Sequence, residues 1–159
     1  EYLVFTSAAW RDQHMGPDAA GLIHSRGRGL IALHRSLDGI DFPTAQVVAE
    51  PGPQGWGGIN VRPSAVVWVP PVWTMLFDEG TTRADSYDEQ CMLAVSTDAQ
   101  MWRRLTPSHR PWVRSSHASG SVRYVDVVLV GDTAHYFYEY ARADLAHALR
   151  HAAVRLRPS

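Results

Sequence analysis

Apolar and polar residues alternate in short runs along the chain, and turn residues separate the runs. In the middle of the sequence this pattern predicts four strands, at Ala65–Val69, Trp73–Asp78, Gln90–Ser96 and Pro111–Ser115. Another strand is expected at Leu3–Ser7. Extended over the whole chain, the pattern predicts about ten strands and an all-β fold.

The strands belong to an internal repeat with a period of about 60 residues. Val61–Val67 recurs as Val122–Val128, and in the same register Trp73–Asp78 falls on Ala134–Glu139. An apolar strand, a turn and an aromatic strand that ends in an acidic residue are therefore repeated as a unit. Repeated antiparallel units of four strands are typical of β-propeller blades.

A second repeated pattern, S-x-D-[G/A]-x-x-[F/W], occurs at Ser36–Phe42 and at Ser96–Trp102. Each copy follows an apolar strand. With both patterns, the 159 residues divide into one domain with a partial blade at 1–60, a complete blade at 61–121 and a partial blade at 122–159. The predicted fold is thus a set of about 2.5 four-stranded propeller blades.

The C-terminal stretch from Ala141 to Arg157 has two possible interpretations. Its alanine and leucine residues recur at helical spacing, and alanine favours a helix. A blade, however, needs a third strand in the last unit, and tertiary context often overrides local propensity. We therefore predict a strand over Ala146–Val154.

Three segments of the middle unit, Arg62–Ser64, Trp73–Phe77 and Leu93–Asp98, resemble one blade of the five-bladed glycoside hydrolases of families 43 and 32. The resemblance implies a five-bladed propeller, of which this chain has about half the usual length. It also implies an aspartate base and a glutamate acid at the starts of innermost strands. At the matching positions this chain has Arg62 and Arg123, which cannot act as acid or base near neutral pH.

Charge and composition exclude several other classes of protein. The formal net charge is −1, which argues against a nucleic-acid partner or an anionic membrane surface. No apolar run is long enough to span a membrane, so we expect no membrane partner. Cys91 is the single cysteine, which fits a reducing compartment and a cytoplasmic location.

The blade pattern places five charged residues near the axis of the expected propeller. Arg62 and Arg123 should lie close to Asp78 or Glu79 and to Glu139, because the innermost strand begins where the second strand ends. One interpretation is a funnel that binds carbohydrate or another small polar ligand through arginine and carboxylate groups. The other is a pair of structural salt bridges, Arg62–Asp78 and Arg123–Glu139.

Five further residues are candidates for the site. Asp126 lies inside an apolar strand, so its carboxylate should be paired or face the central channel. Asp12 and His14 lie in a long early loop that could form a pocket rim, and Tyr138 could be a platform for a sugar ring. His147 is a further candidate ligand-binding residue. The spacing of the histidines matches no metal-ligand motif, so we expect neither a metal nor a cofactor.

Two functions follow from these residues. The first is a divergent glycoside hydrolase whose acids are Asp78 or Glu79, Asp126 and Glu139, with two carboxyl groups about 5 to 9.5 Å apart. The second is a non-catalytic carbohydrate-binding or structural propeller, in which the arginines form salt bridges and no free carboxylate pair remains. An open array of blades would expose apolar faces, so a homodimer that completes the ring is also expected.

Overall fold

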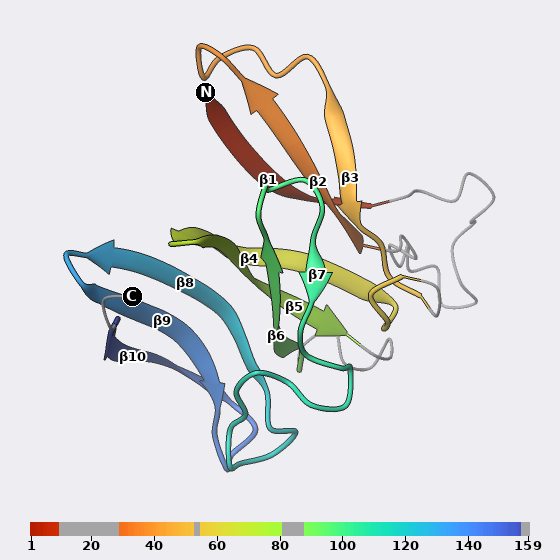
Figure 1. Ribbon diagram of the computed structural model, residues 1–159. Helices are drawn as coiled ribbons and strands as arrows, with labels where there is room; N and C mark the ends of the chain where they lie inside the picture. Colours follow the sequence, from red (N-terminus) through yellow and green to blue (C-terminus); the bar gives the residue numbers. More distant parts are fainter. Residues whose placement is uncertain (10–28, 53–54, 81–87, 157–159) are drawn as a thin grey trace, which may run out of the picture.

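The computed structural model describes residues 1–9, 29–52, 55–80 and 88–156, and these residues form β-strands and no helix (Figure 1). The ten strands are β1 (Tyr2–Ala9), β2 (Gly29–Ser36), β3 (Ala45–Ala49), β4 (Asn60–Val69), β5 (Val72–Gly80), β6 (Gln90–Ser96), β7 (Arg103–Arg104), β8 (Val122–Val130), β9 (Thr133–Ala141) and β10 (His147–Arg155). The predicted all-β class is confirmed. None of the described residues belongs to a helix able to cross a membrane.

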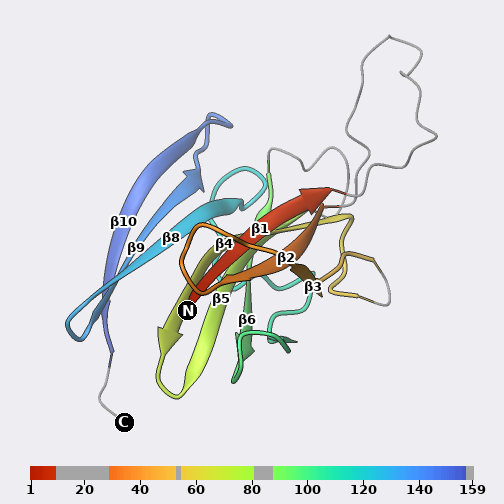
Figure 2. The same ribbon diagram turned by 90° about the horizontal axis from the view of Figure 1, so that it is seen from above.

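The strands form three antiparallel groups along the chain. The first group is β1, β2 and β3, the middle group is β4 to β7, and the third group is β8, β9 and β10. Figure 1 shows them in red and orange, in yellow and green, and in blue, and Figure 2 shows them from above. Single parallel residue pairs link neighbouring groups, Gly29 with Asn60 and Gln90 with Val122. All ten strands therefore belong to one mixed sheet.

The strand register reproduces the internal repeat. Arg62 lies opposite Asp78 in the β4–β5 pair, and Arg123 lies opposite Glu139 in the β8–β9 pair. In both pairs the register shifts close to this position, between Pro63 and Ala65 in β4 and between Arg123 and Asp126 in β8. The middle and third groups are thus built on the same plan.

The sequence misplaces one strand of the middle group. The predicted strand at Pro111–Ser115 is wrong, and the strand paired with the outer edge of β6 is β7, Arg103–Arg104. The reason is that the turn after β6 is short and returns the chain along β6 at once. The predicted segment is instead linked to β6 by a hydrogen bond from the Trp112 amide to the carbonyl oxygen of Cys91, at 2.9 Å.

The predicted strand at the C-terminal end is confirmed. β10 covers His147–Arg155 and pairs with β9 along its whole length. Pairing supplies a partner for the backbone of every second residue, which outweighs the helix propensity of the alanines.

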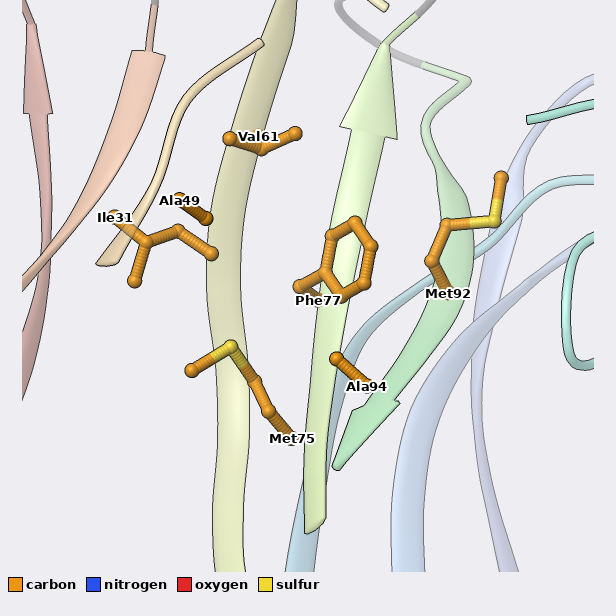
Figure 3. Close-up of a cluster of buried hydrophobic side chains, with 7 residues drawn as sticks. All are labelled: Ile31, Ala49, Val61, Met75, Phe77, Met92 and Ala94. Atoms are coloured by element: carbon orange, nitrogen blue, oxygen red, sulfur yellow. The ribbon is translucent and has the colours of Figure 1, made fainter. Parts of the chain in front are cut away.

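Two hydrophobic cores hold the groups together, one on each face of the middle group. The core between the first and middle groups is shown in Figure 3 and contains Ile31, Ala49, Val61, Met75, Phe77, Met92 and Ala94. The core between the middle and third groups contains Ala65, Leu76, Cys91, Val122, Val125, Val127 and Ala134. Because neighbouring residues of a strand point to opposite faces, Leu76 and Phe77 contribute to different cores.

The repeated S-x-D pattern forms a turn after β2 and again after β6. The Ser36 hydroxyl donates to Asp38 Oδ1 at 2.8 Å, and this oxygen accepts from the amides two and three residues further on, at 2.9 and 3.0 Å. Ser96 and Asp98 make the same bonds at 3.0, 2.8 and 2.8 Å. These bonds lower the pKa of Asp38 to about 2. The motif therefore stabilises the turn.

Candidate functional site

Six residues gather where β4 and β8 begin, and we call them the arginine cluster: Arg62, Asp78, Glu89, Arg123, Tyr124 and Glu139. β4 and β5 supply Arg62 and Asp78, and β8 and β9 supply Arg123 and Glu139. Glu89 comes directly before β6. The cluster therefore joins the middle group to the third group.

Ion pairs connect every carboxylate of the arginine cluster to a guanidinium group. Arg62 Nη2 lies 3.5 Å from Asp78 Oδ2 and 2.8 Å from Glu89 Oε1. Arg123 Nε lies 2.9 Å from Glu139 Oε2, and its Nη1 lies 3.4 Å from Glu89 Oε2. The predicted pairs Arg62–Asp78 and Arg123–Glu139 are thus present, and Glu89 bridges the two arginines.

Tyr124 forms the part of the arginine cluster that is most open to solvent. The guanidinium carbons of Arg62 and Arg123 lie 4.5 and 4.6 Å from the centre of its ring. Tyr124 occupies the bulge of β8 with a φ of 51°, in the left-handed region. There its amide donates to Asp78 Oδ2 at 3.1 Å while the residue remains 44% exposed. The bulge thus turns an aromatic ring outward beside two cations.

Burial dominates the electrostatics of Asp78. Its side chain is fully buried, and burial raises its pKa to about 6, against the opposing effects of the Ser64 hydroxyl, the Tyr124 amide and the Arg62 charge. Glu89 is also almost fully buried, whereas Glu139 is about a third exposed. Burial therefore moves the pKa of Asp78 toward neutral pH.

Asp78→Asn is expected to flatten the dependence of stability on pH between about pH 4 and pH 6. Since the folded pKa is raised from 3.8 to about 6, the folded chain retains a proton that the unfolded chain releases in this window. Wild-type stability should therefore fall as the pH rises through it, by on the order of 3 kcal/mol in total. Urea unfolding at several pH values measures the slope in both proteins.

Asp126→Asn is the matched control, because Asp126 is an exposed carboxylate on the same sheet. It should leave the slope between pH 4 and pH 6 nearly unchanged. If Asp78→Asn and wild type lost stability equally over this range, the raised pKa of Asp78 would be contradicted.

Glu79 lies outside the arginine cluster, on the opposite face of β5. Its fully buried carboxylate accepts two hydrogen bonds from Arg104, at 2.7 and 3.1 Å, and one from the Ser108 hydroxyl at 2.9 Å. Alternation along the strand separates it from Asp78. Glu79 therefore fixes the segment after β7 to β5, away from the other predicted acids.

Three more of the predicted residues lie outside the arginine cluster. Asp126 is exposed, and its carboxylate accepts a hydrogen bond from the Val127 amide at 2.8 Å. Tyr138 packs in the core between the middle and third groups. The buried His147 has its Nε2 3.8 Å from Asp88 Oδ1. Asp12 and His14 lie outside the described residues.

Glu89 and Tyr124 are the residues of the site that the sequence does not single out. A sequence signal for Glu89 exists, because this acid stands directly before the apolar strand β6. By strand register His147 holds the corresponding position at the start of β10, so both groups have an ionisable residue there. Its side chain can be buried because two guanidinium groups share its charge.

No protein-family model matches the chain, and no curated protein matches it. The class defined by the structure is an all-β protein of three linked antiparallel groups. Within the described residues, no three side chains of histidine, cysteine, aspartate or glutamate gather in a way that could hold a metal ion.

The contacts of the arginine cluster favour ligand binding over hydrolysis. Hydrolysis of a glycoside needs a protonated carboxyl group and a second carboxylate that is free to attack or to activate water. In the arginine cluster Asp78, Glu89 and Glu139 are all engaged with arginine. The groups that reach solvent are the partly exposed Arg62 guanidinium, the Tyr124 ring and the arginine-paired Glu139 carboxylate, which suit recognition of a polar ligand.

Proposed function

We propose that the chain is a section of a β-propeller related to the five-bladed glycoside hydrolases, and that it binds a carbohydrate without hydrolysing it. The observation that carries this proposal is the pairing of all three carboxylates of the arginine cluster with Arg62 or Arg123. Arginine occupies the positions where the related enzymes have acids, and it neutralises the acids nearby.

The propeller part of the proposal is supported by the way the groups connect. The strands within each group are antiparallel, and successive groups are linked by one parallel residue pair, as neighbouring blades would be. The strands β4 and β8, which would be innermost, contact each other. In this arrangement β2 corresponds to β6, so the first group would lack its innermost strand and the third group its outermost.

The carbohydrate part is supported by the exposed side of the arginine cluster. An aromatic ring beside hydrogen-bonding side chains can stack on the apolar face of a sugar while the neighbours bind its hydroxyl groups. Tyr124 supplies the ring, held at the β8 bulge, and Arg62 supplies donors. Structural salt bridges and ligand binding are compatible, because the Arg123–Glu139 and Arg62–Glu89 pairs hold this surface in place.

Calorimetric titration with a panel of neutral and acidic mono- and oligosaccharides tests the proposal. Tyr124→Ala is expected to weaken binding at least tenfold with little change in melting temperature. Trp68→Ala is the matched control, since Trp68 is a similarly exposed aromatic residue at the other end of β4. An absence of binding to the whole panel, or equal losses in the two variants, would refute the proposed site.

Assays with aryl glycosides separate this function from the enzymatic alternative. The chain is expected to release no aryl alcohol above the uncatalysed rate. Hydrolysis that disappears in Asp78→Asn would replace the proposal with a divergent hydrolase that uses Asp78 as its acid.

A further inference from the structure

The third group has one face packed on the middle group and one face exposed. Ala134 and Val127 point into the core that the two groups share. The side chains on the opposite face are apolar at several positions and lie open to solvent. We call these the outer face: Val128, Val130, Phe137 and Leu149, which are 45%, 59%, 39% and 76% exposed. By register the same face also carries Asp126, His135 and His151. Exposed apolar side chains gathered on one face of a sheet favour an interaction site.

The internal repeat shows what kind of surface the outer face is. By strand register, Phe137 corresponds to Leu76, and Leu149 corresponds to Cys91. Leu76 and Cys91 are almost completely buried, because they form the surface of the middle group that packs on the third group. The outer face therefore repeats, one group further on, a surface that this chain already uses to bind an antiparallel sheet.

The other end of the array also has exposed apolar side chains. Phe5 packs against the middle group, so the neighbouring Val4 and Tyr2 point away from it. Tyr2, Val4 and Val47 are 54%, 41% and 42% exposed. Figures 1 and 2 show the first and third groups on different sides of the middle group, so the two exposed faces belong to different ends of one array.

We propose that the outer face of the third group binds the Tyr2–Val4 face of the first group in a second copy of the chain. Two copies related by a twofold axis would make this contact twice and cover all four apolar faces. Each contact would repeat the packing that already joins neighbouring groups within the chain. The outer face would therefore be covered by a sheet of the same type, supplied by the second copy. This proposal concerns assembly and does not depend on carbohydrate binding.

Light scattering of the purified chain, with variants at each face, tests the assembly. We expect a mass near twice 17.7 kDa for wild type. Val128→Arg combined with Leu149→Arg should give single chains, and so should Tyr2→Arg combined with Val4→Arg. An equimolar mixture of the two variants should recover dimers, because one of the two contacts then forms between wild-type faces.

Val154→Arg is the matched control, since Val154 is half-exposed on the same strand as Leu149 but on the opposite face. It should remain dimeric, and circular dichroism should show that all variants are folded. A wild-type mass of one chain at about 100 µM, a dimer that survives both double variants, or a mixture that stays monomeric would overturn the proposal. Sugar titration of the monomeric variants distinguishes this failure from failure of the proposed function.

Discussion

Phe77→Ala is expected to lower the free energy of unfolding by about 4 kcal/mol, the largest loss from a single apolar side chain in the described part of the chain. Phe77 is fully buried in the core between the first and middle groups, where its ring lies 4.6 Å from the ring of Trp56. The guanidinium carbon of Arg104 lies 5.5 Å from the centre of the same ring. Removal of the ring leaves a cavity that backbone strands on both sides keep from collapsing.

Urea unfolding followed by tryptophan fluorescence measures this loss. Phe42→Ala provides the control, because Phe42 is only half-buried and lies beyond the turn that follows β2. The control should lose about 1 kcal/mol or less. A loss at Phe77 no larger than that at Phe42 would mean that the two groups do not share this core.

Glu89→Gln is expected to lower the free energy of unfolding by about 3 kcal/mol, since it removes the negative charge that Arg62 and Arg123 share. The substitution preserves shape, so the effect reports charge and hydrogen bonding. Arg123 is almost fully buried, and the substitution removes its pair with Glu89 while leaving its pair with Glu139, at 2.9 Å. Part of the loss is offset at Arg62, which is partly exposed to water and keeps Asp78.

Glu139→Gln is the matched control, because Glu139 pairs with the same arginine but is about a third exposed. Its expected loss is below about 1 kcal/mol, as for other exposed ion pairs. Chemical unfolding at neutral pH and moderate salt compares the two variants. Equal losses would show that Glu89 does not act as the bridge between the middle and third groups.

The sequence predicts most of the sheet because local patterns determine it. The repeat aligns Arg62 with Arg123 and Asp78 with Glu139, and the short turn around Pro70 fixes the register of β4 against β5. Once register is fixed, the pairing of Arg62 with Asp78 follows. The predicted position of the fourth strand of the middle group is wrong, because β7 has only two residues, too few to form an alternating pattern.

The site is harder to predict, since its details depend on bulges and on contacts between groups. The bulge in β8 interrupts the alternation of faces and turns Tyr124 outward. No residue type in this strand predicts the bulge. Asp78 and Glu79 are adjacent acids at the end of one strand, and only the observed packing decides which of them meets the arginines. The bridge through Glu89 depends on how the third group docks on the middle group.

The single parallel residue pairs between groups have a consequence for how the protein folds. Nearly all strand pairing is within a group, between segments close in sequence, while Gly29–Asn60 and Gln90–Val122 are the only ladder links from one described group to the next. Each group can therefore form its own hairpins early, at low entropic expense in loop closure. Cooperativity then rests on the two side-chain cores and on Glu89, so the chain behaves as a short linear array of coupled folding units.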